Sequence, residues 1–288
     1  MESRPMKRFL VASDLSDRSD LAINRALALA GQHRVPLKIL HVVDEDLPAS
    51  LAESIRDYAQ VYLDNRVTAA GLTTAGVDAS VDVIFGHDYQ TVLRVADEDD
   101  AELIILGCHR PADTSGRFLG TVAERVIRQG HRPVLVVKNP AAHDYSKVLV
   151  CIDFSVQAQH ATRCAAALAP GARFCFVHAY QIPFQGLIRG QTTRDQVRVA
   201  HEQRVHRVVQ QQMDAFAHDT AAYETDAQHI IEQGPAVEVI MRQVRRAKPD
   251  LIVAGTHGRT GVAHMLLGSV AEELLRDPPG DMLVVKGW

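Results

Sequence analysis

The sequence predicts an α/β protein made of two similar halves, each a doubly wound sheet of five parallel strands covered by helices. Two observations carry this prediction: the chain repeats itself once along its length, and each copy alternates short apolar runs with longer helical segments. Runs that are apolar at every position are buried on both faces, which is typical of a parallel sheet. Right-handed crossovers between such strands place helices on both sides of the sheet.

Four pairs of segments define the repeat. The first copy begins with KRFLVASDLS and the second with KVLVCIDFSVQ; later, LIILG corresponds to LIVAG, FLGTVAERV to LLGSVAEEL, and both copies close with LVVK. From Gly86 and its counterpart Gly234, the two copies stay in step to their ends. We therefore expect two domains, residues 1–141 and 142–288, with the short linker Asn139–Asp144 at their join.

The pattern of the first copy predicts each of its elements in turn. The first helix has Ser16 or Asp17 at its N-cap, and Gly31 is expected to end it because glycine favours the left-handed C-cap conformation. Gly71 is expected to end the second helix for the same reason. The expected strands are Arg8–Ala12, Leu37–Val43, Ser80–Phe85, Leu103–Leu106 and Pro133–Lys138, and the expected helices are Asp17–Ala30, Ser50–Ala70, Tyr89–Asp97 and Thr121–Arg128. The second copy repeats this order.

Composition and charge exclude several classes of protein. The 288 residues are 47% hydrophobic, carry a net charge of −4 and include only 5% aromatic residues. This balance argues against disorder, against a dominant affinity for nucleic acid and against stacking platforms for single strands. No apolar run reaches the roughly 18 residues of a membrane span, so a cytoplasmic protein without membrane insertion is expected. The four cysteines form no C-x-x-C pair and are expected to be reduced, mostly buried thiols.

The segment after the fourth strand of the second copy carries the strongest functional signal. Gly255, Gly258, Gly268 and Ser269 form the pattern G-x2-G-x9-G-S, which ends where a helix is expected to begin. Glycines let backbone N–H groups approach an anion, and a helix start adds unpaired N–H donors with a partial positive charge. The pattern therefore predicts a phosphate cradle. The alternative is a simple turn followed by an ordinary serine N-cap.

Asp153 ends the first strand of the same copy. The first and fourth strands are neighbours in a doubly wound sheet, and ligands bind at the carboxyl ends of such strands. The Asp153 carboxylate can accept a hydrogen bond from a ribose hydroxyl or from a base N–H. The alternative is an aspartate that caps the following helix near Ser155.

These residues resemble the universal stress protein family, and the two-copy chain resembles its tandem subgroup over nearly the whole sequence. The resemblance implies a Rossmann-like fold of the adenine nucleotide alpha hydrolase type, with strand order 3-2-1-4-5 and last strands that pair between domains or between the protomers of a homodimer. It implies ATP as the ligand, with or without Mg²⁺. In the ATP-binding branch, adenosine is held by the strand-one aspartate and by the backbone after strand two, and the phosphates by the glycine loop. The matching positions here are Asp153, Ala179, Gly255, Gly258, Gly268, Ser269 and Val270.

The first copy departs from this pattern. Its corresponding positions are Asp14, Val42, Gly107, Arg110, Gly120 and Thr121. Arg110 replaces the second glycine of the loop, and Pro111 after it lacks an N–H. Either Arg110 blocks the phosphate space or its guanidinium binds a phosphate directly. We favour a degenerate first site, in which Asp14 is a structural cap.

The histidines and the basic residues of the long helix show no pattern that requires a functional role. The fourteen histidines lack zinc-type spacing, so no metal site is predicted. A basic stripe on the long helix of the second copy is interpreted as a solvated face, with an acidic partner or an anionic lipid surface as the alternative. Its residues are Arg194, Arg198, His201, Arg204 and Arg207. No catalytic residue is predicted, because Ser269 lacks an evident base; at most slow ATP hydrolysis is expected.

The sequence therefore predicts an ATP-binding, nucleotide-sensing regulator of the stress response, with one nucleotide in the second copy and an unidentified protein partner. Nucleotide binding is expected to order the loop Thr256–Leu267 and to change a partner surface. The alternative is a tandem scaffold that binds no nucleotide and serves assembly.

Overall fold

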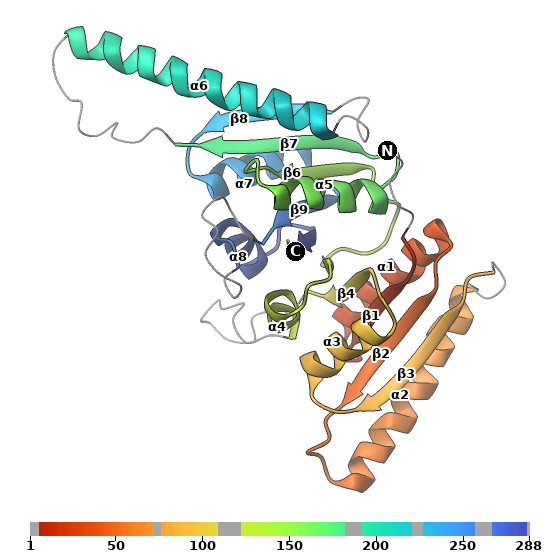
Figure 1. The fold of residues 1–288 in the computed structure, drawn as a ribbon. Helices are drawn as coiled ribbons and strands as arrows, with labels where there is room; N and C mark the ends of the chain where they lie inside the picture. Colours follow the sequence, from red (N-terminus) through yellow and green to blue (C-terminus); the bar gives the residue numbers. More distant parts are fainter. Residues whose placement is uncertain are drawn as a thin grey trace.

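The computed structural model describes residues 6–71, 76–108, 122–181, 192–220, 227–256 and 267–286, with the side chains of α6 described from His201 to Asp219. Both halves follow the predicted alternation of strands and helices (Figure 1). The first half consists of β1 (Phe9–Ser13), α1 (Asp17–His33), β2 (Leu37–Val43), α2 (Ala49–Ala70), β3 (Ala79–Phe85), α3 (Asp88–Glu98), β4 (Leu103–Gly107), α4 (Val122–Gln129) and β5 (Val134–Val137). The second half consists of β6 (Lys147–Cys151), α5 (Val156–Leu168), β7 (Arg173–Tyr180), α6 (Thr192–Thr220), β8 (Gln228–Gln233), α7 (Ala236–Ala247), β9 (Leu251–Gly255), α8 (Ser269–Arg276) and β10 (Asp281–Val285).

The described strands form one continuous sheet in the order β3-β2-β1-β4-β5-β10-β9-β6-β7-β8. Within each half the strands are parallel and keep the predicted order 3-2-1-4-5. The halves meet where β5 and β10 pair antiparallel, with Leu135 opposite Leu283. The predicted α/β class is confirmed. The two predicted sheets are joined into one mixed sheet, because pairing the last strands removes an exposed edge from each half.

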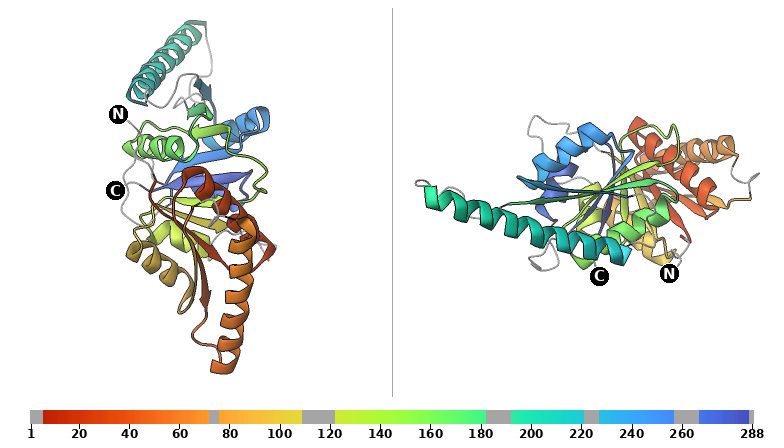
Figure 2. Two further views of the ribbon diagram at one scale, coloured as in Figure 1. Left: turned by 90° about the vertical axis from the view of Figure 1, so that its right-hand side faces the viewer. Right: turned by 90° about the horizontal axis from the view of Figure 1, so that it is seen from above.

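Helices cover both faces of the sheet, as Figures 1 and 2 show. One apolar core packs under α1, α2, α5 and α6, and includes Phe9 of β1 and Phe216 of α6. The other packs under α3, α4, α7 and α8, and includes Leu10 of β1 and Val239 of α7. Successive strand residues alternate between the two cores, since side chains along a strand point to opposite faces. This doubly covered sheet places all parallel strand ends of each half at one edge.

A buried carboxylate ties the join between the halves to the sheet. Asp281 of β10 is fully buried and accepts hydrogen bonds from the Tyr145 hydroxyl (2.7 Å) and from the backbone N–H groups of Lys138 (2.9 Å) and Asn139 (2.8 Å). Arg25 of α1 places its Nε 3.4 Å from Asp281 and donates from Nη1 to the His143 carbonyl (2.8 Å). Residues from both halves and from the segment between them therefore satisfy one buried charge.

The first helix ends later than predicted. α1 passes through Gly31 and stops at His33, and Arg34 takes the left-handed conformation (φ 54°) and donates its N–H to the Ala30 carbonyl. The expected glycine terminus was wrong here because the last residue of the helix is held by tertiary contacts: the His33 ring packs edge-on against Phe9, and its Nε2 lies 2.9 Å from the Leu168 carbonyl oxygen. Gly71 does end α2 in the left-handed conformation (φ 65°). Ser16 is confirmed as the N-cap of α1. Within the described ranges, no helix combines the length and apolar character needed to cross a membrane.

Candidate functional site

A cavity of about 740 Å³ opens at the carboxyl ends of the strands of the second half. It lies where β6, β7 and β9 end and where α8 begins, with α6 along one side. The structure gathers six of the seven predicted site residues in its lining: Asp153, Ala179, Gly255, Gly268, Ser269 and Val270. The seventh, Gly258, lies outside the described residues. Segments far apart in the sequence thus meet in one place, as strand ends of a doubly wound sheet do.

Asp153 is held by a tight turn between β6 and α5. Its Oδ1 accepts hydrogen bonds from the backbone N–H (3.0 Å) and the hydroxyl (2.5 Å) of Ser155. Ser155 itself caps α5, accepting from the Ala158 N–H at 3.1 Å. Asp153 therefore orients the capping residue and does not cap the helix itself. Among the contacts that the structure describes, both hydrogen bonds fall on Oδ1, which leaves Oδ2 for a ligand.

Backbone strain and aromatic packing fix this turn. Phe154 has a φ of 62°, in the left-handed region that costs a bulky residue about 1–2 kcal/mol. The centroid of its ring lies 4.3 Å from that of the His178 imidazole. The His178 Nδ1 lies 2.7 Å from the Ile152 carbonyl oxygen. His178 thereby ties the end of β6 to the end of β7, next to Ala179. The strained Phe154 backbone therefore lies in the turn that positions two predicted site residues, Asp153 and, through His178, Ala179.

The start of α8 presents backbone donors to the cavity. Gly268 is the N-cap, and its N–H donates to the Thr256 carbonyl. Ser269 is the first helical residue, one position after the N-cap, so the ordinary serine N-cap alternative is wrong. The N–H groups of the first turn have no partner within the helix, and both Ser269 and Val270 line the cavity. These are the donors an anion needs.

Gly107 and Gly255, which end the fourth strand of each half, differ in the space available for a side chain. A Cβ on Gly107 would lie 2.8 Å from the Arg18 carbonyl oxygen, so the close approach of α1 demands glycine there. A Cβ on Gly255 would meet the Gln157 Cβ at 3.5 Å, an ordinary contact. Packing therefore accounts for Gly107 but not for Gly255, which lies in the cavity lining.

One wall of the cavity, formed by α6, was not predicted from the sequence. α6 contributes Arg204, Val205, Val208, Val209 and Gln212 to the lining. Of the basic stripe, His201, Arg204 and Arg207 are exposed, in agreement with the solvated-face interpretation, and Arg204 also borders the cavity. Arg194 and Arg198 lie outside the described side chains. Val205, Val208 and Val209 recur at helical spacing beside the stripe, and that apolar pattern was the available signal.

The four cysteines are free thiols of intermediate burial, whereas mostly buried thiols were expected. Cys151 lines the cavity, and burial, with the nearby Asp153 charge, raises the pKa of its thiol to about 12. Burial raises the pKa of Cys164 to about 11. A protonated thiol is a poor nucleophile, so Cys151 contributes apolar surface and no reactive group to the cavity.

The first half repeats the turn at the end of its first strand. The Asp14 Oδ1 accepts from the Ser16 N–H (3.1 Å) and hydroxyl (2.5 Å), and Leu15 has a φ of 62°. Partial burial raises the pKa of Asp14, but hydrogen bonds from Ser16 and Ser19 outweigh it and lower the pKa below its usual value. Val42 lines a separate, smaller cavity. Arg110, Gly120 and Thr121 lie outside the described residues, so the degenerate first site stays a prediction.

Comparison with known proteins identifies relatives of both halves. The model of the universal stress protein family matches residues 5–138 and again residues 144–286. A universal stress protein of Mycobacterium tuberculosis is 25% identical over 297 aligned positions, covering 95% of each chain. Among solved structures, a universal stress protein from Archaeoglobus fulgidus superposes with a TM-score of 0.69 at 20% identity and covers 97% of this chain and 98% of its own. A functionally unknown protein from Pseudomonas aeruginosa gives 0.68 at 21% identity, covering 98% and 92%.

Proposed function

The chain belongs to the universal stress protein family, as a tandem member with one family domain in each half, and from that premise we propose that its second half binds ATP. We propose further that the chain acts as a nucleotide-sensing regulator. The single observation that carries the proposal is the cavity at the strand ends of the second half, which collects Asp153, Ala179 and the start of α8 in one lining.

Each part of this lining suits a different part of the nucleotide. The free oxygen of Asp153 can accept a hydrogen bond from a ribose hydroxyl, and the backbone at Ala179 can pair with the base edge. The valines of α6 offer an apolar wall for a flat base. Gly255 and the first-turn N–H groups of α8 offer donors to the phosphates. One guanidinium, that of Arg204, stands among the described lining residues and adds positive charge.

Magnesium fits this site only through the nucleotide. Asp153 is the single carboxylate among the described lining residues, and its Oδ1 is already engaged by Ser155. Mg²⁺ prefers several oxygen ligands and is commonly bound by one or two carboxylates together with substrate phosphates. When bound, the ion would screen phosphate charge, and this chain's residues would hold the nucleotide around it.

A double substitution that introduces two negative charges tests the location of the nucleotide. In Gly268→Asp/Ser269→Glu, two carboxylates would stand where the phosphates are expected, and like charges at close range cost several kcal/mol. We expect nucleotide-free protein carrying this pair to bind ATP about a hundredfold more weakly than wild type, or worse, by calorimetry. The matched pair Gly120→Asp/Thr121→Glu in the first half should leave the affinity unchanged. The proposal is contradicted if both double variants lose ATP affinity equally, or if Gly268→Asp/Ser269→Glu loses none.

Hydrogen exchange tests the regulatory part. ATP should slow amide exchange in residues 256–267 and in the first turn of α8, because the ligand would engage their N–H groups. The corresponding residues 108–119 of the first half and the first turn of α4 provide the internal control and should not change. Identical exchange of 256–267 with and without ATP, at a concentration that saturates the protein, contradicts a nucleotide-driven change in this surface.

A further inference from the structure

A second, smaller cavity of about 310 Å³ lies at the strand ends of the first half. It is bordered by the segments that follow β2 and β3, by the start of α3 and by Arg125 of α4. Among the described lining residues, three aspartates (Asp44, Asp46 and Asp88) stand against one guanidinium, that of Arg125. Arg125 Nη1 lies 4.0 Å from Asp88 Oδ1, so this arginine is already balanced by one of them. The remaining negative charge disfavours a phosphate and favours a cation.

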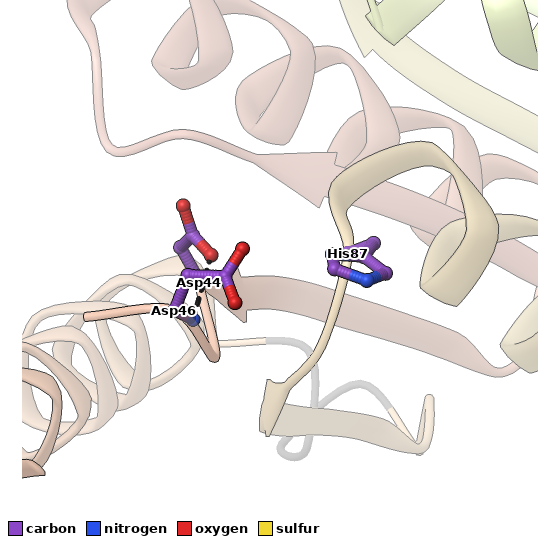
Figure 3. Close-up of side chains that lie close together, drawn as sticks. All are labelled: Asp44, Asp46 and His87. Carbon is purple, nitrogen blue, oxygen red and sulfur yellow. Dashed lines mark hydrogen bonds between the residues drawn. The ribbon is translucent and has the colours of Figure 1, made fainter.

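Three side chains in this lining carry metal-binding atoms that lie near one another. One ligand atom each of Asp44, Asp46 and His87 can be chosen so that all lie within 4.8 Å of one another. Figure 3 shows the two aspartates side by side on the segment after β2 and His87 on the segment before α3. The Asp46 N–H donates to Asp44 Oδ1 at 3.0 Å, which holds the two carboxylates in a tight turn. All three side chains are exposed, so a cation can reach them from solvent.

The spacing suits coordination after small rotations. Bonds of about 2.1 Å in a tetrahedral site bring ligand atoms to about 3.4 Å from one another. The observed limit of 4.8 Å is about 1.4 Å longer than this tetrahedral spacing. Exposed side chains can rotate to close the difference. A third carboxylate stands beside the ring: Glu45 Oε1 lies 3.2 Å from His87 Nε2. A carboxylate next to a ligating histidine orients the imidazole and raises its basicity.

The second half carries other residues at the corresponding positions, so the cluster of Asp44, Asp46 and His87 is not a by-product of the repeated fold. Strand register aligns Val43 opposite Phe85 in the first half with Tyr180 opposite Gln233 in the second. Counting on from these pairs, Asp44 corresponds to Gln181 and His87 to Pro235. Proline offers no metal ligand, and the second-half cavity is lined instead by Ala236 and Ile240 of α7.

We propose that Asp44, Asp46 and His87 form a site for one divalent transition-metal cation of the Zn²⁺ class. Two carboxylate oxygens and one imidazole nitrogen are ligands that Zn²⁺ and Co²⁺ accept, whereas Mg²⁺ and Ca²⁺ favour oxygen alone. Three protein ligands leave the remaining coordination position to water. The site belongs to the first half and does not depend on nucleotide binding in the second. Sequence spacing did not predict it, because His87 lies a whole helix and strand away from the aspartates.

The test uses untagged, nucleotide-free, full-length protein titrated with Zn²⁺ by calorimetry. We expect one saturable Zn²⁺ per chain, and about a tenfold or greater loss of affinity in each of Asp46→Asn and His87→Gln, since even outer-shell changes cost that much. His131→Gln is the matched control, because His131 is also an exposed histidine beside an aspartate, 3.3 Å from Asp97. It should bind Zn²⁺ like wild type.

Co²⁺ provides an independent readout of the ligands. Its visible absorption should show a site of oxygen and nitrogen ligands without thiolate charge-transfer bands, and the spectrum should disappear in His87→Gln. Loss of Zn²⁺ affinity in His131→Gln equal to that in His87→Gln overturns the proposal, as do thiolate bands or no saturable binding. Displacement of Zn²⁺ by a large excess of Mg²⁺ overturns the assigned class of cation.

Discussion

The strand ends of the two halves share a scaffold and differ in what lines it. In both, an aspartate at the end of the first strand orients a capping serine through a strained turn, with Leu15 and Phe154 at the same φ of 62°. In the second half, small residues, valines and a helix start surround a cavity of about 740 Å³. In the first, aspartates and a histidine line a cavity of about 310 Å³. The turn is thus a property of the fold, and ligand chemistry is set by the residues around it.

The largest effect is expected where the halves are joined. Asp281→Ala would leave the buried Arg25 guanidinium without its charge partner, which typically costs about 3–5 kcal/mol of unfolding free energy. Urea unfolding of Asp57→Ala, at an exposed position of α2, serves as the control and should change little. A change below about 1 kcal/mol in Asp281→Ala would mean that the join contributes little to stability.

The two strand-four glycines should separate stability from binding. Gly107→Ala forces a Cβ against the backbone of α1 and should destabilise the fold by about 1–3 kcal/mol. Gly255→Ala meets no such obstacle and should leave the unfolding free energy unchanged or raise it by up to about 1 kcal/mol. Only Gly255→Ala should weaken ATP binding. If both variants lose the same stability, the packing distinction between them is incorrect.

The strand-one aspartates should differ in binding. Asp153→Asn keeps an acceptor for Ser155 but removes the charge beside the expected ribose, so ATP affinity should fall about tenfold, in line with a charged hydrogen bond. Asp14→Asn, at the equivalent position of the first half, should leave the affinity as in wild type. Calorimetric titration of both variants decides the point. A loss in Asp14→Asn would indicate a working first site.

The smallest expected effect is a pH dependence at Asp14. Hydrogen bonds from Ser16 and Ser19 lower the pKa of this carboxyl in the folded chain. A lowered folded-state pKa stabilises the fold above the usual pKa of an aspartate, and this stability is lost as the pH falls through the folded value. The difference in unfolding free energy between wild type and Asp14→Asn should therefore be greater at neutral pH than in acid. A difference that is flat with pH contradicts the assignment; Asp57→Asn controls for loss of one charge.

Much of the fold was predictable because it rests on local patterns. Buried runs such as Leu37–Val43 and the cap at Ser16 follow from apolar content and side-chain hydrogen bonding, and both were confirmed. The extension of α1 past Gly31 was missed, since packing outweighed a weak local preference. The joining of two sheets into one depends on contacts between distant strands, which the family resemblance supplied and periodicity alone did not.

In the candidate sites too, features set by sequence pattern and topology were predictable and features set by tertiary packing were not. The motif residues of the second half lie at strand and helix ends, so their meeting in one cavity followed from the topology. The wall from α6 did not, because the position of a long helix beyond a strand end depends on tertiary packing. The cluster of Asp44, Asp46 and His87 is likewise visible only when β2 and β3 are placed side by side.

The number of nucleotides held per chain decides whether the second half binds ATP and the first does not. Wild-type protein would be saturated with ATP and Mg²⁺, freed of unbound ligand, denatured, and its adenine nucleotide measured by anion-exchange chromatography against protein concentration. We expect one nucleotide per wild-type chain and none in Gly268→Asp/Ser269→Glu. Two nucleotides per chain would contradict a degenerate first half and assign Arg110 to phosphate binding. None would contradict nucleotide binding altogether and support a tandem scaffold.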